Sequence, residues 1–406
     1  MGDLMKFIHT ADWHIGKSLN QESLLDQQRY VLDQIVEAVR LDKPAALIIA
    51  GDLFDHPRPS AEAIELLDAY FNVIIHEAGV PILAISGNHD GAEFLNFGSA
   101  FMRRSGLFMM TQVEQMFQPI EIQDEFGTVQ FFMLPFMTPV AIRSYFTQTD
   151  PAFDPESIKD YNQAMAAVTS KINIIKNPQA RHVIVAHGFI MKTSHHLAHT
   201  PHVQQQYAQE REGERLITVG GTEYIYAHHF LPFHYVALGH LHGAHSVQAE
   251  RIRYAGSIYK YSRSEAMQAK SYTVVNLDDQ GQVTVDKKPL MLKNDVREVK
   301  LKPEDVHHEL YSQDYVFVRV DTDVITPHLY QRVKTVFPNA LEIGRYFDAM
   351  ETMDLIDKLD GHAEKSEIDH LKDFFQHHTA KEISLEQLHL FEQSWQKVTK
   401  QGGNLV

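Results

Sequence analysis

The chain has 406 residues, of which 44% are hydrophobic and 22% are charged, and its formal net charge is −16 at pH 7. At roughly 150 residues per domain, this length predicts two or three domains with a sizeable apolar core. The negative charge excludes an overall basic coat for nucleic acid but leaves room for local basic patches. The lack of cysteine excludes disulfide frameworks, thiolate zinc sites and cysteine nucleophiles.

The N-terminal segment carries an acid at Asp3 and has no long apolar stretch of the kind found in signal peptides. No run in the sequence approaches the roughly 18 apolar residues that a membrane helix needs. We therefore expect a cytoplasmic protein without membrane association. Most of the 25 histidines are expected on the solvated surface, and the candidates for function are those that follow predicted strands.

The first ninety or so residues repeat one pattern, in which an apolar, β-rich run is followed by a short polar motif. Helical periodicity separates the runs, over residues 24–39 and 64–78, and Gly79 provides a stop. Strand–helix–strand units at this spacing predict right-handed crossovers and a sheet with helices on its faces. The runs, 6–10, 45–50 and 80–86, precede Ala11-Asp12-Trp13-His14, Gly51-Asp52 and Gly87-Asn88-His89-Asp90.

Two later runs have the same form. Residues 181–186 end in His187-Gly188, and residues 235–238 end in Gly239-His240-Leu241-His242. In open α/β sheets ligands collect beyond the carboxyl ends of the strands, so the polar residues of all five motifs are expected to converge. Further strand-like segments complete a two-layered sheet core by about residue 275, at 129–134, 251–254 and 272–276.

The residue pattern of the sequence changes after residue 275. Charged, irregular sequence precedes a small predicted α/β unit, with strands at 315–320 and 340–345 around a helix at 327–336. The tail from about residue 364 is predicted helical, and Ser384 to Gln387 form a capping-box pattern. This box opens a helix with an apolar stripe, which must be covered by a partner or by the chain itself. The stripe consists of Leu388, Phe391, Trp395 and Val398.

The strand-end residues supply carboxylate, amide and imidazole donors, and no sulfur. Mixed oxygen and nitrogen sets suit manganese, iron or zinc better than calcium or copper. The number of donors exceeds what one ion needs if positions are to stay open for water, so we expect two ions that share a bridging carboxylate. The predicted ligands are Asp12, His14, Asp52, Asn88, His187, His240 and His242.

Such a centre predicts a reaction at phosphorus. Two-metal centres clamp the attacking and leaving oxygens of a phosphoryl displacement and lower the pKa of bound water. We expect in-line hydrolysis of a phosphodiester, in which the metals neutralise substrate charge and a basic protein is unnecessary. His89 is expected to donate a proton or hydrogen bond, and Asp90 to orient its ring. Asp55 and His56 are expected only to cap or solvate a loop.

Each motif by itself is commonly structural, whereas the ordered set is specific. It resembles the signature of the calcineurin-like metallophosphoesterases. In detail, residues 9–17, 50–55, 86–90 and 239–242 are similar to the DNA nuclease subunits of bacterial SbcCD complexes. The similarity in motifs extends to about residue 275 and continues beyond it as an order of domains.

The resemblance implies a fold and a cofactor. The fold would be α/β (α+β), a four-layer metallophosphoesterase β-sandwich flanked by helices, with a small α/β capping domain and C-terminal helices. The cofactor would be two divalent ions, Mn²⁺ by preference. One ion would be held by Asp12, His14, Asp52 and His242, and the other by Asp52, Asn88, His187 and His240, with His89 assisting catalysis.

The resemblance also implies an activity and partners. Residues 1–275 would form the nuclease domain, 276–360 a capping domain over the DNA-binding face, and 361–406 a helical tail that docks on the SMC-like ATPase SbcC. The substrate would be double-stranded DNA, cut by exonuclease action and by endonuclease action at hairpins or blocked ends, in DNA repair, recombination and replication. The chain would pair as a homodimer within a heterotetramer, and Lys17 would contact phosphate.

One position departs from the pattern of archaeal relatives, which place a histidine directly after the phenylalanine of the second motif. Asp55 occupies that position here, as an aspartate does in bacterial members, and His56 follows it. Any role of such a histidine in selecting exonuclease over endonuclease action therefore does not carry over.

Two other interpretations of the sequence stay open. A free-standing metallophosphatase or cyclic-nucleotide phosphodiesterase would explain the ligands but leaves the accessory domain and tail without a role. An interaction scaffold on the same fold is the non-enzymatic alternative, although such scaffolds usually lose ligands and none is missing here.

Overall fold

The computed structural model describes residues 4–192, 224–346, 372, 383–384 and 386–390. The chain packs as two compact units, Met1–Arg297 and Glu298–Val406, and each is described by itself. None of the described helices is long and apolar enough to cross a membrane.

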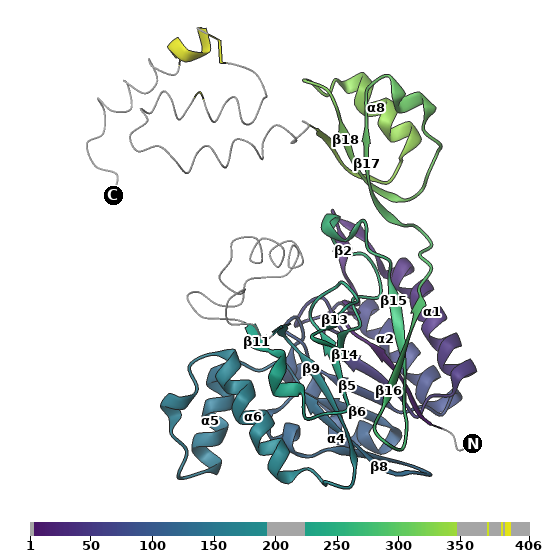
Figure 1. Ribbon diagram of the computed structural model, residues 1–406. Helices are drawn as coiled ribbons and strands as arrows, with labels where there is room; N and C mark the ends of the chain where they lie inside the picture. The colour runs from purple at the N-terminus through teal and green to yellow at the C-terminus, as the bar shows by residue number, and fades with distance from the viewer. Residues whose placement is uncertain (1–3, 193–223, 347–371, 373–382, 385, 391–406) are drawn as a thin grey trace. The chain divides into compact units, whose positions relative to one another are not determined.

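The first unit contains a six-stranded sheet in the order β16-β15-β1-β4-β5-β6 (Figure 1). Strands β1, β4, β5 and β6 are parallel, whereas β15 and β16 run antiparallel along the other edge. Strands β4, β5 and β6 are continuously apolar, as expected of strands that are covered on both faces. The strands are β1 (Met5–Thr10), β4 (Ala46–Ala50), β5 (Ile82–Ile85), β6 (Leu107–Met110), β15 (Ser271–Leu277) and β16 (Val283–Pro289).

Two helices form the crossovers between β1, β4 and β5, as the sequence predicts. Helix α1 (Leu25–Asp42) buries Val31, Leu32, Ile35 and Val39, residues that share one face at helical spacing. Helix α2 (Ala61–Asn72) is capped by the Ser60 side chain and continues as a π-helical turn, η1 (Val73–Glu77). The chain then reverses at Gly79, whose φ of +71° favours glycine.

A second six-stranded sheet has the order β13-β14-β12-β9-β8-β7. Strands β8, β9, β12 and β14 are parallel, and β7 and β13 pair antiparallel at the two edges. The strands are β7 (Ile120–Asp124), β8 (Gly127–Leu134), β9 (Arg181–His187), β12 (Tyr235–Gly239), β13 (Ser246–Val247) and β14 (Ala249–Tyr254).

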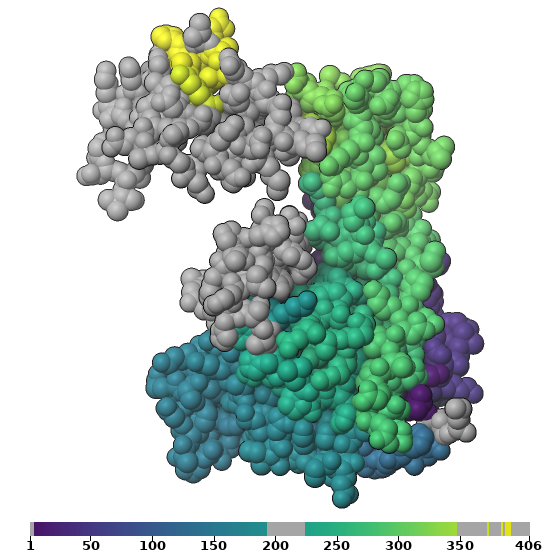
Figure 2. Space-filling view, in the orientation of Figure 1, coloured from purple at the N-terminus to yellow at the C-terminus, as the bar shows by residue number. Residues whose placement is uncertain are grey.

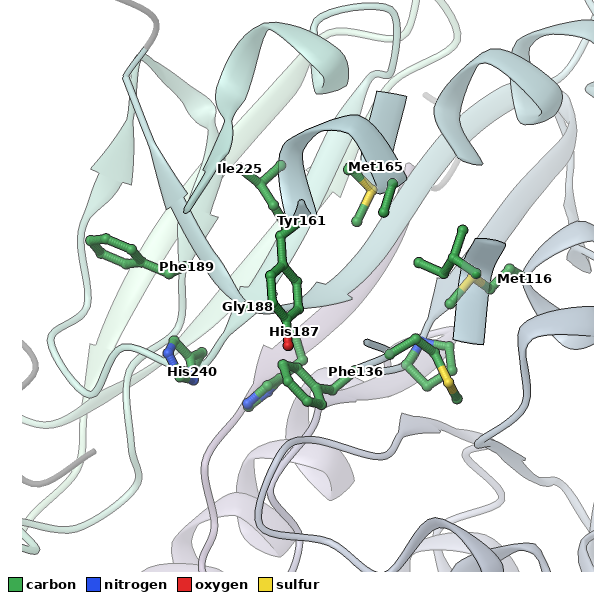
Figure 3. Close-up of a pocket in the computed structure, with 13 residues that line it drawn as sticks. Met116, Phe136, Tyr161, Met165, His187, Gly188, Phe189, Ile225 and His240 are labelled. Carbon is green, nitrogen blue, oxygen red and sulfur yellow. The ribbon is translucent and has the colours of Figure 1, made fainter. Parts of the chain in front are cut away.

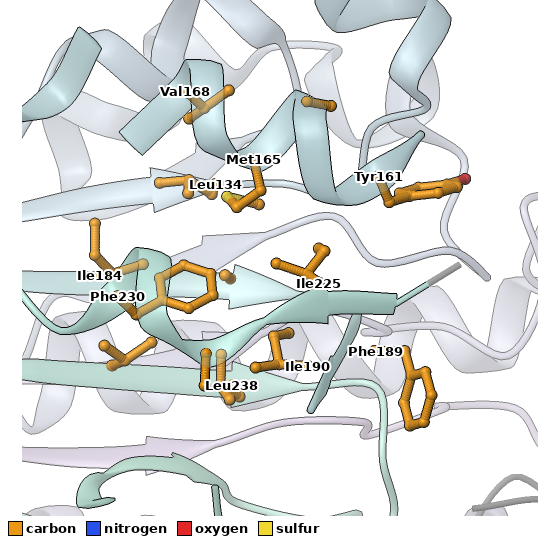
Figure 4. Close-up of a cluster of buried hydrophobic side chains, with 14 of the residues drawn as sticks. Leu134, Tyr161, Met165, Val168, Ile184, Phe189, Ile190, Ile225, Phe230 and Leu238 are labelled. Atoms are coloured by element: carbon orange, nitrogen blue, oxygen red, sulfur yellow. The ribbon is translucent and has the colours of Figure 1, made fainter. Parts of the chain in front are cut away.

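Helices α5 (Pro139–Thr149) and α6 (Tyr161–Ile175) cover the outer face of this second sheet (Figure 1). Their apolar side chains pack on those of the sheet in one buried cluster (Figure 4). The cluster includes Met165 and Val168 of α6 together with Leu134, Ile184 and Leu238 of the strands.

The inner faces of the two sheets pack on each other through a core of fully buried side chains. Phe7 lies edge-to-face against both Phe131 and Tyr235, with ring centroids 5.7 and 5.5 Å apart. Aromatic pairs in this geometry add to the stability that burial of their area provides. The order helix, sheet, sheet, helix gives four layers and confirms the predicted fold class.

Segments that lie far apart in the sequence form one continuous body in the first unit. In the space-filling view the green atoms of β15 and β16 adjoin purple and blue atoms of the N-terminal segments (Figure 2). The sequence predicts that the first domain ends at about residue 275. Strand β16 lies beyond that position, and the compact unit extends to Arg297.

Shorter elements connect the layers. Two small pairs are formed by β2 (Ser18–Leu19) with β3 (Glu22–Ser23) and by β10 (Phe189–Met191) with β11 (Tyr224–Tyr226). The remaining helical pieces are α3 (Ala92–Asn96), α4 (Ser99–Met102), η2 (Arg103–Ser105), η3 (Val113–Phe117), η4 (Pro155–Ser157), η5 (Ala227–Phe230) and η6 (Arg263–Glu265).

The second unit has the small α/β form expected of it. Strands β17 (Val296–Leu301), β18 (Tyr315–Val320) and β19 (Ala340–Arg345) form a sheet, and β18 and β19 are parallel. Helix α8 (Pro327–Val336) joins β18 to β19, and η7 (Asp305–His308) precedes them. The bounds of β18, α8 and β19 equal the predicted ones.

The described part of the tail is short. Ser384 N donates to Gln387 Oε1 and Gln387 N donates to Ser384 Oγ, which are the two reciprocal bonds of the predicted capping box. Residues 386–390 are helical and include Leu388. Phe391, Trp395 and Val398 lie outside the described residues, so the expected apolar stripe stays a prediction.

Candidate metal centre

The loops after β1 and β4 are joined by backbone hydrogen bonds, which bring the first two motifs together. Asp12 N donates to Gly51 O at 3.0 Å, and His14 N donates to Asp52 O at 2.9 Å. Asp12, His14 and Asp52 all have a positive φ, between 45 and 51°. Residues other than glycine rarely adopt a positive φ, and backbone strain of this kind clusters at functional sites.

Two glycines of the motifs are required by close approach. A Cβ on Gly87 would overlap the Asp52 carboxylate, and a Cβ on Gly51 would overlap the His187 ring. The loops can therefore come together around Asp52 only because glycine stands at both positions.

Asp52 lies at the centre of the site and is fully buried. Its Oδ1 accepts a hydrogen bond from His89 N at 2.8 Å. Its Oδ2 lies 3.3 Å from His187 Nε2 and 3.7 Å from His14 Nε2, so it faces histidines on two sides. This oxygen has no hydrogen-bond donor among the described residues.

On one side of Asp52, Asn88 lies between His187 and His240. Asn88 Oδ1 is 2.8 Å from His187 Nε2 and 2.9 Å from His240 Nδ1. His187 Nδ1 donates to the carbonyl oxygen of Ala50 at 2.8 Å, which leaves Nε2 directed into the site. The backbone N–H of His240 donates to both carboxylate oxygens of Asp12, at 2.9 and 3.1 Å.

On the other side, His14 and His242 face each other with their Nε2 atoms 3.1 Å apart. His242 Nδ1 donates to Glu265 Oε1 at 2.9 Å, so Nε2 is the nitrogen that faces the site. The backbone carbonyl oxygens of His14 and Trp13 accept hydrogen bonds from Gln28 Nε2. All seven predicted ligands thus lie together at the carboxyl ends of the parallel strands.

The donor set fits divalent cations. Three groups of carboxylate and imidazole donors lie within 4.8 Å of one another: Asp12 with His14 and His242, Asp12 with Asp52 and His187, and His14 with Asp52 and His89. Asp52 Oδ2 is buried without a donor among the described residues, and the Nε2 atoms of His14 and His242 point at one another. A cation would satisfy the carboxylate oxygen and take the lone pairs of both rings.

Charges within the site shift the pKa values of its groups in opposite directions. Burial favours the neutral form of Asp52, yet the neighbouring His187 holds the pKa of this carboxyl well below its usual range. Burial alone would lower the pKa of His187, but the negative charge of Asp52 and the hydrogen bond to the Ala50 carbonyl oxygen raise it to about 9. His14 differs, since burial outweighs its acidic neighbours and lowers its pKa. Asp52 is therefore ionised at neutral pH, and a divalent cation would neutralise its charge.

His89 lies at the edge of this cluster and is partly exposed. Its ring is edge-on to that of His14, with centroids 4.8 Å apart, and its Nδ1 donates to the backbone oxygen of Asp55 at 3.0 Å. The Asp55 carboxylate lies 4.0 Å from the same nitrogen. His89 is thus oriented by Asp55.

Asp90 has partners other than the expected His89 ring. Its carboxylate accepts hydrogen bonds from the backbone N–H groups of Leu53, Phe54 and Gly87 at 2.9 to 3.1 Å, which ties the second motif to the third. Burial and the nearby Asp52 raise the pKa of Asp90 to about 6. The expectation that Asp90 orients His89 is corrected accordingly, because the short loop aims the two side chains in different directions.

Two carboxylates beside the site have roles that the sequence patterns do not predict. Asp55 lies 2.8 Å from Lys17 Nζ and 3.5 Å from His14 Nδ1, which is more than the capping role expected of it. Its position three residues after Asp52, in the same motif, is a signal that could have found it. Glu265 follows His242 by 23 residues and ends the short helix η6, and no local pattern marks it.

The predicted phosphate contact, Lys17, is about three-quarters buried and paired with Asp55, so its ammonium faces the site.

A small apolar pocket of about 30 Å³ lies against His187 and His240 (Figure 3). Phe136 lies edge-on to the His187 ring, with centroids 6.3 Å apart, and packs beside Tyr161. This volume holds about one water molecule. The apolar side chains that line the pocket therefore pack against the two histidine rings and restrict their movement.

Comparison with known proteins identifies the class to which this fold and site belong. The family model described as calcineurin-like phosphoesterase matches residues 5–249, and the chain belongs to this family. It is a metal-dependent hydrolase on a metallophosphoesterase fold.

The more particular relationship comes from curated relatives. The D subunit of the SbcCD nuclease from Staphylococcus epidermidis is 32% identical over 86% of this chain and 87% of its own length. Its counterpart from Staphylococcus saprophyticus is 32% identical over 84% of each chain. The chain therefore belongs to the family of SbcCD D subunits, as its motifs predict.

A solved structure of a dimetal phosphatase from Danio rerio covers 71% of this chain and 98% of its own, with 12% identity and a TM-score of 0.39. This likeness is too low to add to the assignment.

Proposed function

We propose that this chain is the nuclease subunit of a DNA-cleaving complex and hydrolyses phosphodiester bonds of double-stranded DNA with two divalent ions, Mn²⁺ by preference. The action would be exonucleolytic, and endonucleolytic at hairpins or blocked ends, in DNA repair, recombination and replication within the cytoplasm. The relatives at 32% identity are described as nuclease subunits, and this supports the proposal.

The observation that carries the proposal is the position of Asp52. Its Oδ2, which is buried and has no hydrogen-bond donor among the described residues, lies within 4 Å of histidines on two sides. One ion would be held by Asp12, His14, Asp52 and His242, and the other by Asp52, Asn88, His187 and His240. When bound, the ions would polarise the phosphoryl oxygens and lower the pKa of water.

The side chains around this centre have separate tasks in the reaction. His89 would donate a hydrogen bond or a proton to an oxygen of the phosphodiester, and Asp55 holds its Nδ1 in place through a backbone oxygen 3.0 Å away. Asp90 would act indirectly, because its three backbone contacts fix the loops that carry Asp52 and Asn88. Lys17, paired with Asp55, would contact a substrate phosphate.

The domain roles and the partner belong to the same proposal. Residues 1–275 would form the nuclease domain, 276–360 the capping domain, and 361–406 the tail that docks on an SMC-like ATPase, SbcC. The complex named in the relatives' descriptions, SbcCD, supports a second subunit as the partner.

A second copy of the chain would bind through the surface formed by α2, α3 and α4. Phe97 and Phe101 are exposed by 84 and 79%, and Phe94 and Met102 are exposed by 45 and 40%. Phe94, Phe97 and Met102 border an apolar groove of about 340 Å³ that reaches Phe54 and Phe71. Exposed apolar surface of this extent is typical of an interface, and the heterotetramer would contain two such subunits.

The proposal is tested by DNA cleavage with Mn²⁺, using linear and hairpin-ended duplexes, with and without ATP and the ATPase partner. We expect degradation of both substrates that is lost in Asp52→Ala and His89→Ala variants. Turnover of small phosphoesters or cyclic nucleotides without cleavage of DNA, even with the partner present, would favour a free-standing phosphatase instead. Unchanged cleavage in the variants would contradict the assigned centre.

A further inference from the structure

The side chain of Glu265 is the most heavily bonded carboxylate beside the metal centre. Its Oε1 accepts from His242 Nδ1 at 2.9 Å, from Ser262 Oγ at 3.0 Å and from Tyr261 N at 3.2 Å. Its Oε2 accepts from Lys270 Nζ at 2.6 Å and from Ser257 Oγ at 3.1 Å. Glu265 is only 2% exposed, and its bonds to His242, Tyr261, Ser257 and Lys270 are buried, whereas the bond from Ser262 is partly buried.

The partner of this carboxylate, Lys270, is also buried, with 1% of its side chain exposed. Besides Glu265, its ammonium lies within hydrogen-bond distance of Ser257 Oγ and Gln268 Oε1, both at 2.7 Å, and of the backbone oxygen of His242 at 3.1 Å, so its three N–H donors are shared among four acceptors. Removing both charges of such a pair from water costs free energy of desolvation. The attraction between the charges offsets this cost only when the other hydrogen-bonding positions of both groups are also occupied, as they are here. The pair therefore holds His242 at two points, its ring and its backbone.

We propose that the Glu265–Lys270 pair is a positioning device for His242, which fixes the imidazole proton on Nδ1 and turns the Nε2 lone pair toward the metal centre. A carboxylate can only accept, so it selects one of the two neutral tautomers of the ring. The inference rests on the proposed metal centre. Carboxylates that hold the second nitrogen of a metal-bound histidine typically contribute 10- to 100-fold to metal affinity.

The other histidines of the site are held differently, which gives Glu265 a distinct role. His187 Nδ1 donates to a backbone carbonyl oxygen, at Ala50, and no single substitution removes that acceptor. His14 Nδ1 lies 3.5 Å from Asp55, a contact longer than a good hydrogen bond. His242 thus relies on an acceptor that a substitution can remove.

The experiment measures Mn²⁺ affinity and stoichiometry in the metal-free full chain, together with thermal unfolding and the electron paramagnetic resonance spectrum of the loaded protein. We expect Glu265→Gln to weaken Mn²⁺ binding by roughly 10- to 100-fold at the site that includes His242. The spectrum should change from that of a coupled ion pair toward that of a single ion.

A double variant separates positioning from stability. In Glu265→Leu with Lys270→Met, both charges are replaced by apolar side chains of similar volume, which removes the desolvation cost together with the acceptor. We expect the unfolding temperature to recover relative to Glu265→Gln while Mn²⁺ affinity stays low. Recovery of both would show that the pair has only a structural role and would overturn the inference.

A matched control lies in the same unit, away from the site. Arg181 and Asp124 form another ion pair that is largely shielded from solvent, and Asp124→Asn breaks it. This variant should lose stability but keep the Mn²⁺ affinity of the parent. If the parent binds no Mn²⁺, the proposed function fails; if it binds two ions and the Glu265 variants bind them equally well, only this inference fails.

Discussion

At the scale of single residues, the bridging position of Asp52 leads to a prediction about metal content. Asp52→Asn keeps the shape of the side chain but removes the charge that faces His14 and His187. We expect fewer than two tightly bound Mn²⁺ ions per chain and a loss of phosphodiesterase activity on the order of 10³-fold, because both ions would share this ligand in the proposed centre. Elemental analysis after dialysis and hydrolysis of a chromogenic phosphodiester measure the two effects.

Asp26→Asn is the matched control, since Asp26 is an exposed acid in the first turn of α1. It should keep the metal content and the activity of the parent. Two tightly bound ions in Asp52→Asn would contradict the bridging role.

A buried histidine outside the metal centre predicts how stability depends on pH. His9 is fully buried between the sheets, where its Nδ1 meets the Tyr235 hydroxyl at 2.9 Å. Burial, with Arg253 nearby, lowers the pKa of His9 from 6.5 to about 3. Below pH 6.5 the unfolded chain therefore binds a proton that the folded chain does not, and the free energy of unfolding falls as pH falls.

The measurement is urea unfolding of the metal-free protein at pH 7.5 and pH 5, for the parent and for His9→Asn. Between these pH values the free energy of unfolding should fall by about 2 kcal/mol more in the parent than in the variant. The reason is that one proton changes this free energy by about 1.4 kcal/mol per pH unit. Equal losses in the two proteins would show that His9 already carries a proton in the fold.

The convergence of the seven candidate ligands could be predicted from sequence because each follows an apolar run, and parallel strands end at one edge of a sheet. The partners of these side chains could not. Glu265 reaches His242 only through a turn in the loop after β14, and the direction of Asp90 depends on backbone groups of the β4 loop. Contacts of this kind depend on loop conformation, which no periodicity in the sequence encodes.

At the scale of secondary-structure elements, the packing of the two sheets leads to a prediction about stability. Phe131 of β8 is fully buried in the core between the sheets and lies edge-to-face on Phe7. Phe131→Ala should lower the free energy of unfolding by about 3–5 kcal/mol, because the cavity it leaves cannot collapse between two sheets. Phe126→Ala in the β7–β8 turn, where the ring is 40% exposed, should change it by less than about 1 kcal/mol.

Denaturant unfolding of the parent and of the two variants measures these changes in the free energy of unfolding. A loss below about 1 kcal/mol for Phe131→Ala would mean that the two sheets do not share a close-packed core.

The exposed aromatic surface of α3 and α4 predicts self-association. Phe97→Asp with Phe101→Asp should convert a dimer into a monomer, since two buried carboxylates without partners oppose the contact. Analytical ultracentrifugation measures the mass, and Phe126→Asp, an exposed ring elsewhere in the same unit, is the control. A monomeric parent, or a double variant that stays dimeric, would contradict the assignment of this surface.

The bounds of elements with strong periodicity are close to those predicted, and β18, α8 and β19 match fully. The sequence was less informative about α2, where helical spacing continues to residue 78 but the structure changes to a π-helical turn at Val73. The extra residue in that turn keeps Ile74 buried, and apolar spacing does not distinguish it from regular helix.

At the scale of the whole molecule, the proposed metal centre and the proposed partner-binding segment belong to different parts of the chain. The candidate ligands and the side chains that hold them lie between Asp12 and Lys270, within the unit that ends at Arg297. The apolar stripe predicted for the tail begins at Leu388, in a helix that the Ser384 capping box opens. A stripe of this kind needs an apolar partner surface.

Deletion of the residues after about 360 should therefore abolish co-purification with the SMC-like ATPase while Mn²⁺ content stays at the level of the full chain. A finer version replaces Leu388 and Trp395 by glutamate in the full chain, which places charge on the stripe. Leu390→Glu is the matched control, because it puts the same charge on the same helix beside the stripe, where the native side chain is 66% exposed. If the truncated chain still co-purifies with the ATPase, partner binding lies in the first 360 residues and the tail must cover its stripe against its own chain.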